Sequence, residues 1–187
     1  MNIRKVSGLI FLALLFAGGV AGGYFYFSGN FPEKQDDREA ANLLSKTDAL
    51  MSMRMYYPAG NQLKMEERNI PRRTSPIAIA EIVVEEYLKG PKNAGSVNMP
   101  KDARLLGLYK GADRILYIDI SDEIRRNFQG DVILEYLLLK GLYESIISNV
   151  EDIQDVKVLI EGKEAETLGG HLYLLYPLKD MVSYEYQ

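Results

Sequence analysis

The fold is decided by residues 104–120, which read RLLGLYKGADRILYIDI. Residues 104–109 and 114–120 are two runs dominated by apolar and aromatic residues. Between them, Lys110-Gly111-Ala112-Asp113 supplies residue types that favour tight turns. The stretch therefore predicts an antiparallel hairpin, and this is the clearest element in the sequence.

Strands and helices alternate on both sides of this hairpin. Upstream, the pattern predicts strands near 53–57 and 62–68 with a turn at 58–61, then a helix that begins after an N-cap at Ser75 and stops at Gly90-Pro91. Downstream, it predicts a long helix over 132–150 capped by Asp131, a strand over 156–160 and a last apolar strand at 172–176. We expect one compact α+β domain over 51–180, with two helices packed on a mostly antiparallel sheet, and a short tail at 181–187.

The N-terminal region has a different character. Residues 8–27 carry no charge and, as a helix, would span about 30 Å, the thickness of a bilayer core. Because Arg4 and Lys5 precede them, we expect residues 1–7 in the cytoplasm and the domain on the extracytoplasmic, periplasmic side of the membrane. The alternative is a cleaved signal peptide, since residues 17–23 are small. Residues 28–50 are predicted to be a polar spacer.

Two overlapping GxxxG pairs lie within the predicted anchor. Gly18 with Gly22, and Gly19 with Gly23, have the spacing that lets two membrane helices approach closely. The motif is short and common, so a helix that merely contains glycines explains it as well.

Composition excludes several classes of function. The chain has no cysteine and a single histidine, so disulfides, thiolate catalysis and a lipid-modified cysteine are ruled out. The net charge of −4 argues against a nucleic-acid partner. Gly169-Gly170 lacks the further glycine and lysine of a phosphate-binding loop, and no cofactor or metal site is predicted.

Carboxylates are the only candidates for acid–base catalysis. The adjacent pair Glu85 and Glu86 is explained by a solvated helix face, and Asp119 by the outer face of a strand. Asp122 and Glu123 lie where acidic residues favour the start of a helical turn. No catalytic residue is predicted.

Several phrases, taken in order, resemble the GerM domain of sporulation and spore-germination proteins. A helix ends in Tyr87-Leu88-Lys89-Gly90-Pro91, and a strand leads into Asp119-Ile120-Ser121. A later strand turns at Gly162-Lys163 and is followed by Gly169-Gly170-His171. The resemblance covers about residues 53–178. It departs from the family at Leu142-Tyr143-Glu144, where members often have a Thr-Leu pair.

The resemblance implies a compact α+β fold similar to the ring-building motifs of bacterial envelope complexes, and no enzymatic activity. The motif residues would be determinants of the fold: Gly90 and Pro91 as a helix stop, and Gly170 and His171 as a turn that the imidazole fixes by hydrogen bonds. Asp119, Ser121 and Gly162 belong to the same set.

Three hypotheses for the function follow. The first is a membrane-anchored, non-enzymatic scaffold that contacts other envelope proteins or copies of itself, including as a ring. The second is a peptidoglycan-binding module or a regulator of a cell-wall hydrolase, which would use some of the thirteen tyrosines as stacking surfaces. The third is a hydrolase built on Asp119 or Glu85.

Overall fold

The computed structural model describes residues 15–26, 49–92 and 99–183, which fall in two compact units, Met1–Asp48 and Ala49–Gln187. In the first unit, residues 15–26 are helical and carry the four glycines of the predicted packing motif. Among the described residues, no helix is long and apolar enough to cross a membrane. The rest of the predicted anchor, at 8–14 and 27, lies outside the described part of the chain, as do residues 1–7 and 28–48.

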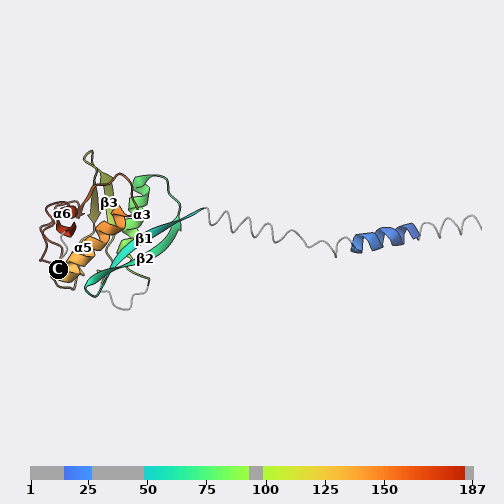
Figure 1. The fold of residues 1–187 in the computed structure, drawn as a ribbon, viewed down its shortest axis with the longest axis horizontal. Helices are drawn as coiled ribbons and strands as arrows, with labels where there is room; N and C mark the ends of the chain where they lie inside the picture. Colours follow the sequence, from blue (N-terminus) through green and yellow to red (C-terminus); the bar gives the residue numbers. More distant parts are fainter. Residues whose placement is uncertain (1–14, 27–48, 93–98, 184–187) are drawn as a thin grey trace, which may run out of the picture. The chain divides into compact units, whose positions relative to one another are not determined.

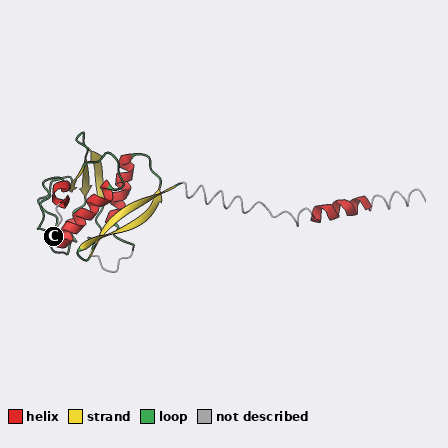
Figure 2. Ribbon diagram, viewed as in Figure 1, coloured by secondary structure: helices red, strands yellow, loops and turns green. Residues whose placement is uncertain are grey.

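The second unit holds the folded domain (Figures 1 and 2). Its described elements, in chain order, are β1 (Leu50–Ala59), β2 (Gln62–Pro71), α3 (Pro76–Leu88), β3 (Leu105–Lys110), β4 (Ile115–Ile120), α4 (Glu123–Arg126), α5 (Val132–Ile147), β5 (Asp155–Ile160) and α6 (Leu178–Ser183). The predicted α+β class is confirmed, and the hairpin predicted at 104–120 is the antiparallel pair β3–β4.

The prediction of one sheet is wrong, although the pairing is mostly antiparallel as expected. The strands form a two-stranded antiparallel sheet, β1–β2, and a separate three-stranded sheet in the order β3-β4-β5. In the second sheet β4 and β5 run parallel, because α5 carries the chain back across the sheet before β5 begins. Helices α3 and α5 contact each other; α3 packs on β3, and α5 packs along β1 (Figure 1).

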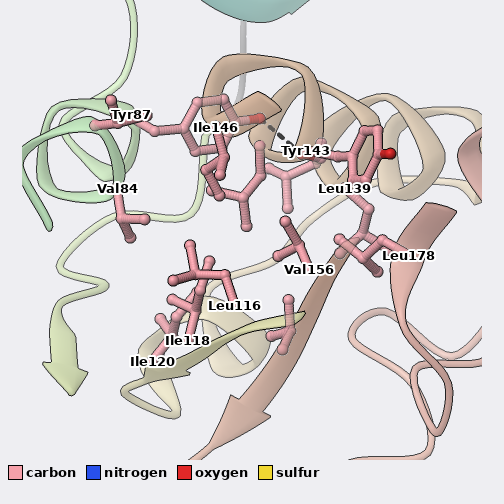
Figure 3. Close-up of a cluster of buried hydrophobic side chains, with 14 of the residues drawn as sticks. Val84, Tyr87, Leu116, Ile118, Ile120, Leu139, Tyr143, Ile146, Val156 and Leu178 are labelled. Carbon is pink, nitrogen blue, oxygen red and sulfur yellow. Dashed lines mark hydrogen bonds between the residues drawn. The ribbon is translucent and has the colours of Figure 1, made fainter. Parts of the chain in front are cut away.

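The hydrophobic core lies between the helices and one face of the three-stranded sheet. Alternate residues of β4 point into it, namely Leu116, Ile118 and Ile120, and all three are fully buried. Figure 3 shows them facing Val84 of α3 and Ile146 of α5 across the core. The remaining residues of β4, including Tyr117 and Asp119, therefore lie on the outer face of the sheet.

The strand predicted at 172–176 is also wrong. In the structure this segment is irregular and leads into α6. The reason is a lysine on β5: Lys157 is only 4% exposed, and its ammonium donates to the main-chain carbonyls of Leu174 and Leu175. A buried side chain therefore takes the backbone hydrogen bonds that a neighbouring strand would have made.

Helix α5 covers the free edge of β1. The main-chain N–H of Tyr56 donates to Ser145 Oγ at 2.9 Å, and the N–H of Arg54 donates to Asn149 Oδ1 at 3.0 Å. Asn149 Nδ2 donates back to the Arg54 carbonyl at 2.6 Å. The approach is close at Gly141, where a Cβ would stand 2.4 Å from the Tyr56 carbonyl oxygen. Glycine at this helical position therefore lets strand and helix pack directly.

Candidate functional site

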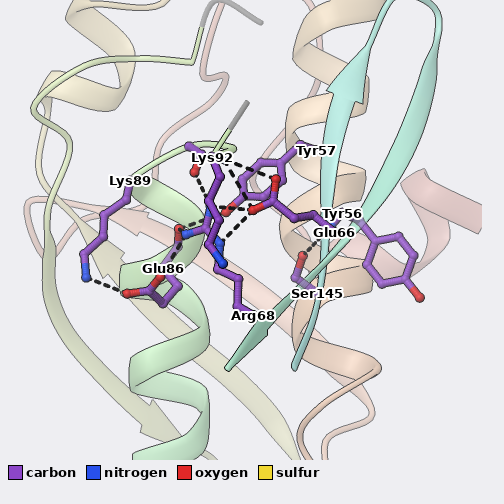
Figure 4. A network of polar contacts seen from close by, with 9 residues as sticks. Tyr56, Tyr57, Glu66, Arg68, Glu86, Lys89, Lys92 and Ser145 are labelled. Carbon is purple, nitrogen blue, oxygen red and sulfur yellow. Dashed lines mark hydrogen bonds and ion pairs between the residues drawn. The ribbon is translucent and has the colours of Figure 1, made fainter. Parts of the chain in front are cut away.

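The end of α3 is held by a buried arginine on β2 (Figure 4). Arg68 Nη1 donates to the Glu86 carbonyl oxygen at 3.0 Å and to Glu86 Oε2 at 2.8 Å, while Nη2 donates to the Gly90 carbonyl oxygen at 2.5 Å. Its Nε donates to Glu66 Oε1 at 2.9 Å. The guanidinium also lies 5.3 Å from the centroid of the Tyr57 ring, within cation–π range. Arg68 therefore joins the last turn of α3 to the β1–β2 hairpin.

Both partners of this network are held in their charged forms. Burial opposes the charge on Arg68, but hydrogen bonds to Glu86 and Glu66 outweigh it and raise the pKa of the guanidinium. For Glu86, burial favours the neutral acid, but hydrogen bonds from Lys89 and Arg68 lower the pKa of the carboxyl. Burial also raises the pKa of the Tyr57 hydroxyl, which donates to the Glu86 carbonyl at 2.9 Å. The network is built for stability rather than for proton transfer.

Gly90 takes the backbone conformation that its place at the end of α3 requires. Its φ is +79°, in the left-handed region that favours glycine, and its N–H donates to the Tyr87 carbonyl at 3.0 Å. Pro91 follows, and the helix cannot continue through it. Lys92 N–H then donates to Glu66, which ties the outgoing chain to the same network.

The second group of motif residues lies at the ends of β4 and β5. Asp119 Oδ1 accepts a 2.7 Å hydrogen bond from the N–H of Gly162, whose φ of +74° forms the turn after β5. Ser121 is buried, and its Oγ accepts from the N–H of Arg104 at 3.1 Å. Ser121 also hydrogen-bonds Glu123 and lowers the pKa of that carboxyl. These side chains fasten the loops that leave the sheet.

The third group is organised by a buried glutamate on the first turn of α5. Glu135 has no exposed surface. Its Oε1 accepts from the N–H groups of Leu168 and Gly169 at 3.1 and 2.8 Å, and its Oε2 accepts from the N–H of His171 at 3.0 Å. The imidazole Nδ1 of His171 is also 2.8 Å from Oε2. Because an ionised carboxylate only accepts, this geometry places the ring proton on Nδ1.

Glycine at position 169 is explained by the same cluster. A Cβ there would stand 2.3 Å from the Phe128 ring and 3.0 Å from Glu135 Oε2. Gly170 has a φ of +97°, which turns the chain so that the next N–H also faces the carboxylate. The turn at 168–171 is therefore shaped around Glu135.

The structure does not gather the motif residues into one site. Gly90 and Pro91 line an open groove of about 800 Å³ between the end of α3 and residues 99–105, and Arg104, the partner of Ser121, lies in its wall. Asp119, Gly162, Gly170 and His171 are not among its lining residues. Charges of both signs line the groove, namely Glu85 and Asp102 with Lys89, Lys101 and Arg104. They provide no concentrated field for a charged ligand.

Glu85 is exposed and lines the groove, and three other candidate carboxylates have structural partners in different places. Glu86 is bound by Arg68 and Lys89, and Asp119 by the main chain of Gly162. Asp122 precedes α4 and pairs with Arg126 at 2.7 Å. Within the described ranges, no group of three His, Asp or Glu side chains could hold a metal ion.

Two residues that organise these clusters, Glu135 and Arg68, were not singled out by sequence. The sequence around each of them nevertheless indicates a buried side chain. Glu135 is the one charge in an otherwise apolar run at the start of α5, and such a residue needs a buried partner. Arg68 lies two positions before the buried Ile70 on β2, so the period of the strand points it inward.

A family model named Germane, described as sporulation and spore germination, matches residues 54–166, more than half of the chain. This chain belongs to the Germane family. The match ends before Gly170 and His171, so the turn at 168–171 lies beyond it. No curated protein matches the chain.

Two solved structures of GerMN domains agree with the Germane assignment at the level of the fold. The tandem GerMN domains of the sporulation protein GerM from Bacillus subtilis align with a TM-score of 0.52 at 17% identity, over 70% of this chain and 47% of that one. The first GerMN domain alone aligns with a TM-score of 0.50 at 15% identity, over 67% and 94% of the two chains. A Clostridium perfringens protein aligns at 0.49 and 20% identity, over 70% and 87%. The chain spans about half the length of the tandem structure.

Proposed function

We propose that this protein is a non-enzymatic scaffold of the cell envelope, in which a single Germane domain is held at the outer face of the cytoplasmic membrane by residues 8–27. It acts by contacts with other envelope proteins and with copies of itself. Family membership carries the proposal, since the Germane match is described by sporulation and spore germination and by no reaction.

The use of polar residues in the domain supports a scaffold. Arg68, Glu135 and Lys157 are buried, and each makes hydrogen bonds to main-chain groups of loops or helix ends. Such side chains fix the shape of a domain, whereas a catalytic group must keep an atom available for substrate. A rigid surface is what a protein needs in order to bind partners at low cost in entropy.

The uncharged run at residues 8–27 supports the proposed tether. Residues 15–26 are helical, and a Cβ added at Gly18, Gly19, Gly22 or Gly23 would meet open space. These glycines form one strip along the helix at intervals of three and four residues, so a second copy of the helix can approach it closely. Pairing of anchors would bring two Germane domains together.

Crosslinking in intact cells tests the scaffold proposal. A photoreactive residue is placed in turn at exposed positions of β2 and α3, and crosslinked products are separated by mass. The proposal expects discrete products from the membrane fraction that contain a second copy or another envelope protein. The domain should also be digested by protease added outside the cytoplasmic membrane. A chain that fractionates as a cytoplasmic monomer with no crosslinked product contradicts the proposal.

A further inference from the structure

Strand β2 turns a row of main-chain groups away from its partner β1. The N–H groups of Arg54 and Tyr56 on β1 point away from β2, because they donate to side chains in and just after α5. In an antiparallel pair, residues that point away from the partner strand face one another across the ladder. The register of β1 with β2 therefore turns outward the main-chain groups of four residues of β2, namely Leu63, Met65, Glu67 and Asn69.

This outer edge of β2 is open. Within residues 49–92 and 99–183, the N–H and C=O groups of these four residues accept or donate no hydrogen bond. Met65 is also 47% exposed. By comparison, β3 of the other sheet has six residues, and its pairing with β4 shifts register between Leu105 and Gly107. A short, bulged strand is a poor template for another strand, whereas β2 is a regular strand of ten residues.

The sequence of β2 is complementary to itself in one register. Two copies pair in antiparallel fashion about a twofold axis when their outward-pointing residues face one another. If Met65 faces Met65 of the second copy, then Lys64 faces Glu66 of the second copy, and Glu66 faces its Lys64. In the described domain, Lys64 is exposed and has no ion-pair partner. Opposite charges that face each other stabilise a pair of strands, and this register has two such pairs.

The neighbouring registers bring like charges together. An axis at Lys64 places two lysines opposite each other, and an axis at Glu66 or at Glu67 places two glutamates opposite each other. Like charges in directly facing positions destabilise a pair of strands. Charged residues on an edge strand usually prevent unwanted pairing, and on β2 they disfavour these registers but not the one centred on Met65. The charge pattern therefore fits a second copy of the same strand.

We propose that two copies of this chain join by antiparallel pairing of β2 with β2, centred on Met65. The two hairpins then form one continuous sheet in the order β1-β2-β2-β1. This inference rests on the proposed scaffold function and specifies how one copy contacts another. Because both copies use the same surface, the contact closes after two copies and gives a dimer rather than a filament.

Disulfide crosslinking of the full chain in membranes tests the pairing. The natural chain has no cysteine, so Met65→Cys introduces a single thiol. In the proposed register the two Cα atoms at position 65 are about 5.5 Å apart, which is within the range of a disulfide. Mild oxidation should therefore give a disulfide-linked dimer. The matched control is Leu106→Cys, because Leu106 lies on β3 and is also 47% exposed; it should remain largely monomeric.

Charge variants in the Met65→Cys chain test the register. Lys64→Glu places two glutamates opposite each other on both sides of the axis, so the yield of dimer should fall about fivefold or more. Lys64→Gln removes the attraction without adding repulsion, so the yield should fall less. The melting temperature of each variant checks that the domain is folded. Self-pairing is overturned by the absence of a dimer from Met65→Cys, by equal yields from the two cysteine positions, or by a yield that neither change at Lys64 reduces.

Failure of this pairing can be told apart from failure of the scaffold proposal. If Met65→Cys gives no dimer but photoreactive residues on α3 still give discrete products, the scaffold function stands and only the pairing of β2 is lost. If photoreactive residues on β2 capture a different protein and Met65→Cys gives no dimer, the edge binds that protein, and self-pairing is again overturned.

Discussion

Replacing Glu135 by glutamine tests whether this one carboxylate holds the turn at 168–171. Glutamine has nearly the same shape, so the packing around position 135 is preserved. Its oxygen can still accept from the N–H groups of Leu168 and Gly169, but its NH₂ group would then face the N–H of His171 and the proton on Nδ1. Two acceptor contacts thus become contacts between donors.

The magnitude follows from the partners that are lost. An unsatisfied buried donor costs about 1–3 kcal/mol, and a hydrogen bond to a charged group is about 1 kcal/mol stronger than a neutral one. The imidazole of His171 is 40% exposed and can turn toward water, so only the main-chain N–H of His171 is fully stranded. Together with the lost charge on the two remaining bonds, Glu135→Gln should lower the free energy of unfolding by about 3–5 kcal/mol.

Urea unfolding of residues 49–187, followed by circular dichroism, measures this change, since that unit contains the whole hydrophobic core. The matched control is Glu81→Gln on the exposed side of α3. His171→Ala should cost less than Glu135→Gln, because it removes only the ring contact. A Glu135→Gln variant within about 0.5 kcal/mol of the wild type, the usual effect of a surface change, would refute the reasoning.

Three further predictions concern the contacts of the β1–β2 hairpin with α3, with α5 and with the residues that follow α5. Gly141→Ala should lower the free energy of unfolding by about 1–3 kcal/mol in the same assay. The new methyl group meets the Tyr56 carbonyl, and this clash outweighs the better helix propensity of alanine. An increase in stability would contradict the close approach of helix and strand. Asn149→Ala should cost about 1 kcal/mol and speed amide exchange at Arg54 in hydrogen-exchange NMR, while unchanged exchange would show that the edge is covered in another way. Because folding lowers the pKa of Glu86, its contribution to stability is present above the unfolded pKa of about 4.3 and is lost as the pH falls through the lower folded value; Glu86→Gln should flatten this part of the curve of melting temperature against pH.

Local signals predicted the elements well where local interactions decide them. The hairpin at 104–120 was placed to within a residue, because its two apolar runs and its turn are read directly from neighbouring positions. For α5, Asp131 Oδ1 accepts from the N–H of Leu134 at 2.9 Å, as an N-cap does. The short helix α4 begins at Glu123, where acidic residues indicated a helical turn.

The errors occur where residues far apart in the sequence decide the structure. The apolar segment at 172–176 has the composition of a strand, but Lys157 binds its carbonyls and so keeps it irregular. The hairpin β1–β2 could have extended the main sheet, but the outer edge of β1 bonds instead to Ser145 of α5 and to Asn149 just after α5, about ninety residues later. No local pattern specifies either partner.

The motif residues show the same limit. Sequence predicted that the His171 ring fixes a turn by hydrogen bonds, and the structure shows such a contact, to Glu135. Glu135 could be suspected as the partner because it is the one charged residue in an apolar run. Its three hydrogen bonds from main-chain N–H groups, however, depend on the path of the chain after β5. Likewise, the sequence identifies Gly90 as a helix stop, but it does not predict the hydrogen bond that Arg68 donates to the Gly90 carbonyl oxygen.

The position of β1 between β2 and α5 has a mechanical consequence. β1 is the first strand of the domain, so a pull transmitted along the chain from its N-terminal side enters the fold at Leu50. Force along the strand acts across its hydrogen bonds to β2, to Ser145 and to Asn149. All of these bonds are therefore strained at the same time. Bonds loaded together must break together, whereas bonds pulled from one end open singly. A pull along β1 would therefore be resisted by all of these bonds together.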